Sequence, residues 1–209
     1  MLPTLVNRTV LGLTPGADMR SMRQDGLMLQ GAVGHVRLVE VDGRLLVEKR
    51  MADTVRHDSE VRALRGLARS DLPVPRLVSV EPGSILMTQM PGERLDSLSS
   101  DKQLEGLRAS AELLRRLHQV QPPPGLPDAP DDASIVRRYR VAGGPPLPLR
   151  IPPARGPVFC HGDWTAGNLL AADGEITAVI DWEAAHVCDP LRELSRAAWG
   201  ASLNAPCSF

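Results

Sequence analysis

The chain of 209 residues has few cysteines and no long apolar run. Its three cysteines, at positions 160, 188 and 207, are an odd number without the spacing of a metal-ligand set, which is the usage of an intracellular protein. No apolar run approaches the length of a membrane-spanning helix, and the chain does not start with a charged and then apolar signal segment. We therefore expect a soluble, cytoplasmic protein without a membrane partner.

The chain also lacks an excess of charge of either sign. Its 24 Lys and Arg residues balance 25 Asp and Glu residues, so nothing indicates nucleic acid as a partner. No internal repeat is visible. A chain of this length buries a sizeable core, either as one domain or as two lobes that share a cleft.

The most informative stretch runs from His161 to Asn168 and contains Asp163; it is followed thirteen residues later by Asp181. Kinase-like phosphotransferases use an Asp to meet the hydroxyl that receives the phosphate, and an Asn and a second Asp to hold magnesium. Each residue taken alone is more simply a turn, cap or strand-end residue. Together, at this spacing, they predict a phosphotransferase.

The segment between Asn168 and Asp181 has the pattern of a β-hairpin. Two apolar runs flank Asp173-Gly174, and an Asp-Gly pair in that position is a strong hairpin signal. Because a hairpin brings its open ends together, we expect Asn168 and Asp181 to lie side by side. Oxygen ligands at adjacent strand ends suit a hard cation that keeps some of its waters, such as Mg²⁺.

The run from Phe159 to Trp199 resembles the catalytic half of the aminoglycoside phosphotransferase family, whose members phosphorylate small molecules. The matching pieces are His161-Gly162-Asp163 with Asn168, then Ile180-Asp181-Trp182-Glu183, then Asp189-Pro190. The resemblance implies an α+β, protein-kinase-like fold of two lobes. The N-terminal lobe would be an antiparallel sheet with one helix, and the C-terminal lobe would be mainly helical with a catalytic β-hairpin.

The resemblance also implies roles for the motif residues. Asp163 would be the catalytic Asp, and Asn168 and Asp181 would be the Mg²⁺ ligands. ATP would be the donor, and the acceptor would be a hydroxyl of an aminoglycoside or of another amino alcohol or sugar. Trp182-Glu183 stands where protein kinases carry Phe-Gly, which favours the small-molecule branch.

A phosphate-binding cation is expected upstream, held by an acidic partner. The strand predicted over residues 44–50 alternates, so that Lys49 shares an apolar, inward face with Leu45 and Val47. A lysine there also suits an edge strand or a solvent-facing position. Glu60 borders the buried face of a helix predicted over residues 54–69, where a solvated glutamate is the simpler alternative. The order of strand lysine and helix glutamate favours a Lys49–Glu60 pair that binds the nucleotide phosphates.

Two further segments complete the predicted nucleotide site. Gly31 and Gly34 lie between apolar runs and are candidates for a phosphate-covering loop, although two glycines in a hairpin are also plain turn chemistry. A strand predicted from Ser84 ends in Pro91-Gly92, and the resemblance implies that the chain crosses between lobes there. The backbone of residues 88–90, with Thr88 and Met90 at its ends, is then expected to meet the adenine; an ordinary strand and turn remains the alternative.

These segments divide the chain into a nucleotide-binding lobe, residues 1–90, and a catalytic and acceptor lobe, residues 91–209. The second lobe is expected to contain helices over residues 101–120, 133–140 and 190–199, with Pro- and Gly-rich stretches over 121–130 and 143–157. Seven acidic residues against one Arg between residues 161 and 195 would suit a cationic acceptor.

The chain departs from the family after residue 199. Family members continue with further helices, so the second lobe is expected to be incomplete and the helix over 190–199 to expose an apolar face. Cys188 replaces a common Gly and Glu193 a common Asp, and Asp189 is expected to brace the catalytic loop. The alternative function is therefore a truncated or regulatory pseudokinase that binds nucleotide without transferring phosphate.

Overall fold

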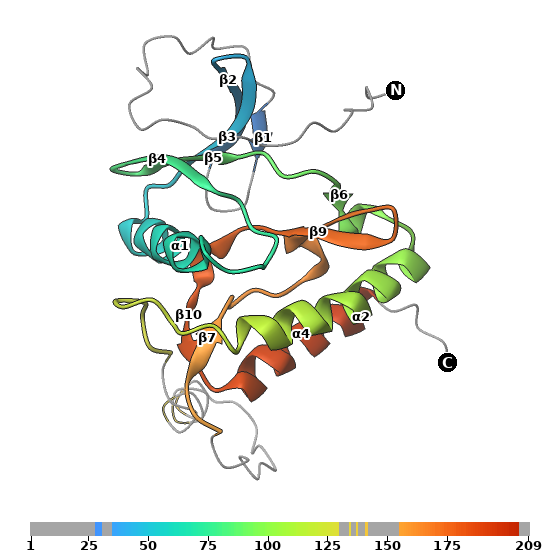
Figure 1. The fold of residues 1–209 in the computed structure, drawn as a ribbon. Helices are drawn as coiled ribbons and strands as arrows, with labels where there is room; N and C mark the ends of the chain where they lie inside the picture. Colours follow the sequence, from blue (N-terminus) through green and yellow to red (C-terminus); the bar gives the residue numbers. More distant parts are fainter. Residues whose placement is uncertain are drawn as a thin grey trace.

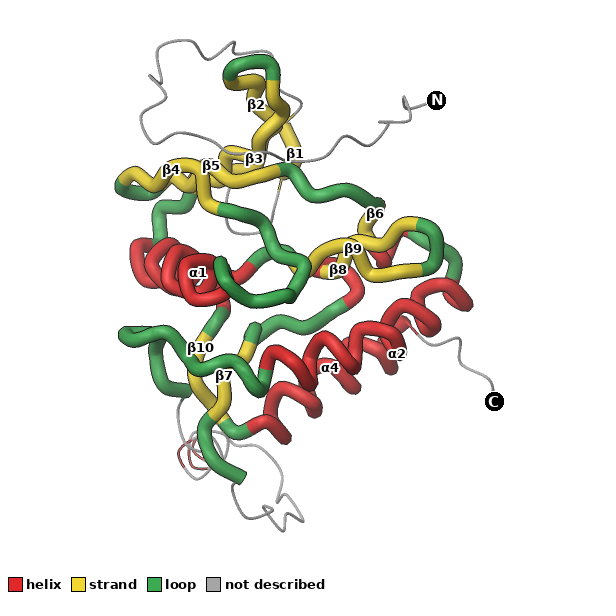
Figure 2. Tube along the Cα trace, viewed as in Figure 1, coloured by secondary structure: helices red, strands yellow, loops and turns green. Residues whose placement is uncertain are grey.

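A computed structural model describes residues 28–30, 35–129, 134, 137, 141 and 155–204. Figure 1 shows an antiparallel sheet stacked above a second group of strands and two long helices. Figure 2 shows the upper sheet as a layer of strands and the lower part as a mixture of helices and short strands. The predicted α+β fold, with an antiparallel sheet in the N-terminal part and a more helical C-terminal part, is therefore confirmed. Most of the predicted helix over 133–140 and most of the stretch over 143–157 lie outside the described residues.

The upper sheet has five antiparallel strands in the order β1-β2-β3-β5-β4. Their bounds are β1 Met28–Gln30, β2 His35–Val41, β3 Arg44–Arg50, β4 Leu77–Glu81 and β5 Ser84–Thr88. Strand β3 pairs with both β2 and β5, and Lys49 lies opposite Val36 on one side and Ile85 on the other. Lys49 is thus on a central strand, which rules out the edge-strand alternative.

Strand β3 is buried on both faces, which differs from the prediction of a single inward face. Lys49 is 6% exposed as expected, but Leu45 is 42% exposed. On the opposite face Leu46 and Glu48 are 5% and 4% exposed. The reason is a second apolar cluster on that face, formed by Val39, Val41, Leu46 and Leu86.

Helix α1, Thr54–Leu67, covers the inner face of this sheet. Its first turn is capped by Asp53, whose carboxylate accepts hydrogen bonds from the backbone N–H groups of Val55 and Arg56 at 2.9 and 3.1 Å. Glu60 and Leu64 lie on its buried face, as predicted. The helix ends two residues before the predicted boundary.

The predicted hairpin is present below the upper sheet. Strands β8 Leu169–Ala172 and β9 Glu175–Val179 flank a turn in which Asp173 and Gly174 have φ of 53° and 84°. Two positive φ angles in succession give the turn that matches the twist of a hairpin. A short strand, β6 Glu93–Arg94, adds to the edge of β8.

Two helices form the lower layer. Helix α2, Ser100–Leu117, lies beside helix α4, Pro190–Asn204, which also contacts strand β7, Val158–Cys160. Helix α4 continues beyond the predicted end at residue 199. Its predicted apolar face is only partly bare, because Ala197 packs against the core while Leu194 is 48% exposed.

The core beneath the hairpin is built around His161, which is fully buried. Its ring contacts Trp182 and Trp164 edge-on, with centroids 4.5 and 5.8 Å apart. Both indole N–H groups have partners: Trp164 donates to the Ser110 hydroxyl at 3.1 Å and Trp182 to a backbone carbonyl at 2.9 Å. None of the described helices is both long and apolar enough to cross a bilayer.

Candidate active site

Lys49 reaches from β3 into a group of carboxylates. Its Nζ lies 2.7 Å from Glu60 Oε2, 2.6 Å from Asp181 Oδ1 and 2.9 Å from Glu183 Oε2. The predicted Lys49–Glu60 pair is confirmed, and both side chains are almost fully buried. Asp181 arrives from the far end of the hairpin, so that Lys49 connects the upper sheet to the lower part of the molecule.

The charges of this group determine its ionisation. Burial alone would lower the pKa of Lys49, but the carboxylates of Glu60 and Asp181 hold it above the ordinary lysine value. Burial raises the pKa of Glu60, and the Lys49 ammonium opposes that effect. The ammonium is therefore charged at neutral pH, and the site has a surplus of acid.

Glu183 is a member of this group that sequence reasoning missed. Its Oε1 accepts a hydrogen bond from Arg56 on α1 at 2.7 Å, while its Oε2 meets Lys49. Two cations thus face three carboxylates. Glu183 follows Asp181 by two residues, the backbone of Asp181 is left-handed with φ of 65°, and both side chains contact Lys49.

Asp163 lies in the loop after β7, and both of its carboxylate oxygens are engaged. Its Oδ2 accepts a hydrogen bond from Asn168 Nδ2 at 3.0 Å, and the same amide also donates to the backbone carbonyl of Asp163 at 2.9 Å. Its Oδ1 pairs with Arg196 of α4 at 2.6 Å. Arg196 is a second residue that sequence reasoning missed, because no motif pairs a helix arginine with this Asp.

The hairpin brings the backbones of Asn168 and Asp181 together, as predicted. The N–H of Ile180 donates to the carbonyl of Asn168 at 2.9 Å. The two side chains turn to different partners, Asn168 to Asp163 and Asp181 to Lys49.

The loop that carries Asp163 is held by buried polar contacts. The N–H of Asp163 donates to His161 Nδ1 at 3.2 Å, so the imidazole proton is on Nε2, 3.0 Å from the carbonyl of Ile180. Burial lowers the pKa of His161, which keeps this neutral form. Glu193 Oε1 accepts the N–H of Gly162 at 3.0 Å.

The bracing role expected of Asp189 is wrong. Its carboxylate accepts the N–H of Leu191 at 2.9 Å and that of Arg155 at 2.5 Å, so it caps the first turn of α4 and ties it to residue 155. Glu193, one turn further along α4, contacts the catalytic loop instead.

A pocket of about 220 Å³ joins the two groups. It is lined by Arg56, Gly162, Asp163, Asp181, Glu183, Ala184 and Arg196. A Cβ at Gly162 would lie 2.2 Å from the carbonyl oxygen of Ala184, and φ there is +84°, so only glycine lets the loop form this wall.

The donor set fits a hard divalent cation. Oxygen atoms of Glu60, Asp181 and Glu183 lie within 4.8 Å of one another, and the Asp181 side chain is 41% exposed to the pocket side of the group. Carboxylate oxygens are ligands that Mg²⁺ prefers. Three carboxylates here face two cationic side chains, so the group has negative charge left for a metal ion.

Of the other residues predicted to contact the nucleotide, the structure describes Thr88 and Met90. Gly31 and Gly34 lie outside the described residues. The N–H of Thr88 donates to the carbonyl of Arg76 at 2.9 Å, and its hydroxyl accepts the N–H of Arg76 at 2.9 Å. The N–H and the hydroxyl of Thr88 are thus both hydrogen-bonded to Arg76 at the end of β5, whereas Met90 lies in the segment that leaves the sheet.

The sequence of residues 35–208 matches the model of the phosphotransferase enzyme family. The chain belongs to this family. The predicted phosphotransferase class is therefore confirmed. No curated protein sequence matches it.

Solved structures show the same kinase-like fold at low identity. A thermostable mutant of aminoglycoside phosphotransferase APH(4)-Ia, in complex with ADP and hygromycin B, is 20% identical, with a TM-score of 0.61 over 82% of this chain and 70% of that one. A streptomycin–ATP complex of APH(2")-IIa is 17% identical, with a TM-score of 0.59 over 80% and 68%. An aminoglycoside phosphotransferase homologue from Ralstonia eutropha is 15% identical, with a TM-score of 0.61 over 81% and 62%.

Proposed function

We propose that the phosphotransferase moves the γ-phosphate of ATP to a hydroxyl of an aminoglycoside-like molecule or of another amino alcohol or sugar. The observation that supports this proposal is that Asp163 and Asp181 line one pocket and that Lys49 forms an ion pair with Asp181. The ADP and ATP complexes of the similar structures support ATP as the donor.

In this proposal, residues 1–90 bind the nucleotide and residues 91–209 bind the acceptor. Lys49, fixed by Glu60, holds the phosphates, and the backbone of residues 89–90 meets the adenine in the segment after Thr88. Asn168 and Asp181 would hold Mg²⁺, with Glu183 nearby. When bound, the ion neutralises charge on the phosphates.

Asp163 would receive the acceptor hydroxyl. As the hydroxyl oxygen forms its bond to the γ-phosphorus, the bond from that phosphorus to the bridging oxygen of ADP breaks. The hydroxyl proton passes to the Asp163 carboxylate and then to solvent, and the products are ADP and a phosphate monoester. The protein contributes mainly position and charge, since phosphoryl transfer needs little covalent participation.

The substitution Asp163→Asn tests the role of this carboxylate. It removes the proton acceptor and keeps the shape, so we expect turnover to fall by about 10²–10⁴-fold. Nucleotide affinity should be unchanged, because no predicted nucleotide ligand is lost. Coupled ADP release, measured over a panel of amino-sugar acceptors, gives turnover, and calorimetry gives the affinity. Asp173→Asn, in the exposed hairpin turn, is the control; equal turnover in Asp163→Asn would remove Asp163 from the mechanism.

A second candidate function is nucleotide binding without transfer. The observation that favours it is the ion pair between Arg196 and Asp163, which occupies the oxygen atom that a hydroxyl would approach. An acceptor has to share or displace this guanidinium. Magnesium-dependent ATP binding without turnover on any acceptor would identify this second function.

A further inference from the structure

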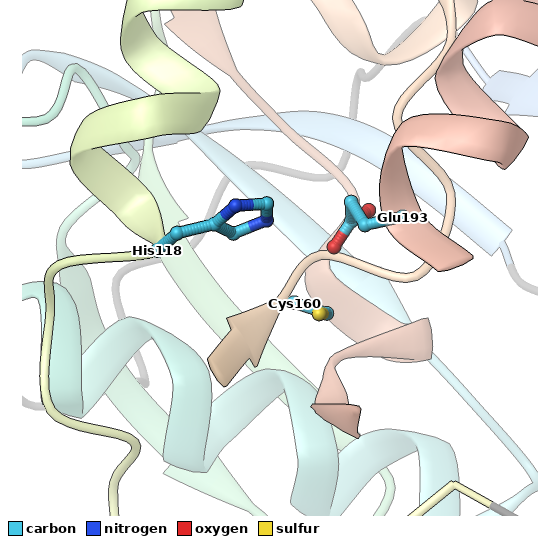
Figure 3. Close-up of side chains that lie close together, drawn as sticks. All are labelled: His118, Cys160 and Glu193. Carbon is cyan, nitrogen blue, oxygen red and sulfur yellow. The ribbon is translucent and has the colours of Figure 1, made fainter. Parts of the chain in front are cut away.

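Three side chains from separate elements meet beside Gly162, in the loop that carries Asp163. Figure 3 shows His118 at the end of α2, Cys160 at the end of β7 and Glu193 in the first turns of α4. One ligand atom from each lies within 4.8 Å of the others. Cys160 is 0% and Glu193 2% exposed, while His118 is half-buried and provides a route from solvent.

Two polar atoms of this cluster are buried with no partner. Glu193 Oε1 accepts the N–H of Gly162, but Glu193 Oε2 meets no donor, and His118 Nε2 has no partner either. Buried polar atoms in native proteins are nearly always satisfied, so this pair requires an explanation. Because both face a cysteine sulfur, a cation that accepts nitrogen, oxygen and sulfur ligands would satisfy them together.

A second thiol completes the cluster. Cys188 of β10, His186–Cys188, has its sulfur 3.0 Å from that of Cys160. Zn²⁺ binds the thiolate form of cysteine and the neutral form of histidine, so a bound cation would release the thiol protons.

We propose that His118, Cys160 and Glu193 bind one Zn²⁺ ion, with Cys188 as the fourth ligand. Zn²⁺ takes four-coordinate sets of nitrogen, sulfur and oxygen, with ligand atoms about 3.3–3.8 Å apart at ordinary bond lengths. The three ligand atoms that lie within 4.8 Å of one another would move closer together, and Cys188, whose sulfur lies against that of Cys160, would turn toward them. A thiolate is a poor ligand for Mg²⁺, which separates this site from the carboxylates around Lys49. The linear sequence gives no sign of it, because the ligands come from four separate elements.

The ion would tie the catalytic loop to the lower layer. It would join the end of α2, the β7–β10 strand pair and the first turns of α4. Glu193 would bind it through one oxygen while holding Gly162 with the other, which is the arrangement by which hydrogen-bonded ligands orient a metal site. Zn²⁺ would therefore stabilise the folded chain.

The test uses the full chain, reduced and freed of metal. We expect one equivalent of Zn²⁺ to be retained through gel filtration. Zn²⁺ at 100 times its Kd should raise the unfolding midpoint by about 5–11 °C. Co²⁺ as a spectroscopic probe should give a thiolate-to-metal charge-transfer band. Binding at least tenfold weaker is expected in Cys160→Ser and in Glu193→Gln, which keeps an oxygen acceptor for Gly162.

Cys207→Ser is the matched control and should bind as the unchanged chain does. If Cys160→Ser does not fold, Glu193→Gln and the charge-transfer band decide the question. Absence of one-to-one binding, a band unchanged in Cys160→Ser, or a disulfide between Cys160 and Cys188 in the native protein would overturn the site. Unchanged affinity in Cys188→Ser would overturn the assignment of the fourth ligand.

Discussion

The ammonium group of Lys49 pairs with three carboxylates, so replacing Lys49 should lower the free energy of unfolding by more than the loss of one ion pair would. The substitution Lys49→Met leaves Glu60, which is 1% exposed, without a cation inside the protein. Removing one partner of a buried pair typically costs about 3–5 kcal/mol. We expect that decrease in the free energy of unfolding, measured by urea denaturation without magnesium or nucleotide.

The double variant Lys49→Met, Glu60→Gln separates the loss of the pair from the loss of packing. It removes the unpaired carboxylate, so it should recover part of the lost stability. A single variant that loses less than about 1 kcal/mol would mean that Glu60 is protonated and that the pair contributes little.

The ionisation of Glu48, on the outer face of the upper sheet, should make the free energy of unfolding depend on pH. Burial alone would raise its pKa, but ion pairs with Arg37 and Arg50 lower it below 4.5. A lowered folded-state pKa contributes stability that is present above pH 4.5 and is lost as the pH falls through the folded value. We expect Glu48→Gln to cost about 1–3 kcal/mol near neutral pH and progressively less under acid conditions.

Unfolding curves from about pH 7 to pH 3 test this expectation, with exposed Glu40→Gln on the neighbouring strand as the control. A cost for Glu48→Gln that is constant over the whole range would show that its ionisation does not contribute.

Among the elements, the β8–β9 hairpin packs closely against Gly92, which lies outside it. A Cβ on Gly92 would lie 2.5 Å from the Thr177 hydroxyl and 2.8 Å from the carbonyl oxygen of Ala171, and φ is +108°. We expect Gly92→Ala to lower the free energy of unfolding by about 2–4 kcal/mol. Gly43→Ala is the matched control, with φ of +72° and nothing within 4 Å, and should cost only about 1–2 kcal/mol. Equal urea midpoints for the two variants would contradict the steric argument.

Local patterns predicted the elements of this protein well. The period of apolar residues and the Asp-Gly turn located α1 and the β8–β9 hairpin to within two residues, because both depend on neighbours in the chain. The faces of Lys49 and Glu60 on a strand and a helix allowed their pairing, and the order of strand lysine and helix glutamate favoured it.

Contacts between distant elements were not predictable in the same way. Arg196 meets Asp163, and Glu193 rather than Asp189 holds the catalytic loop, because of how α4 packs beneath it. The burial of both faces of β3 likewise depends on a tertiary cluster that strand alternation does not encode. The roles assigned to the site residues stay predictions: Asp163 in catalysis, Asn168 and Asp181 in binding Mg²⁺, and Lys49, Glu60, Gly31, Gly34, Thr88 and Met90 in binding the nucleotide.

At the scale of the whole molecule, magnesium and nucleotide together should stabilise the folded chain. If Asp181 is a ligand of the metal–nucleotide complex, MgATP at 100 times its Kd should raise the unfolding midpoint by about 5–11 °C. The shift should require magnesium and vanish in Asp181→Ala, while Asp173→Asn keeps it. Scanning calorimetry measures it. A shift that survives in Asp181→Ala would place the nucleotide elsewhere.

The segment that leaves β5 is fastened to the hairpin almost at once. The Thr177 hydroxyl donates to the carbonyl of Pro91 at 2.6 Å, and Glu93 pairs with Ala171 across β6 and β8. The connection from the upper sheet to the lower part is therefore short and hydrogen-bonded to the hairpin. A rotation of the upper sheet relative to the lower part would therefore be transmitted to the hairpin whose ends carry Asn168 and Asp181, and the spacing of these two predicted metal ligands would change with it.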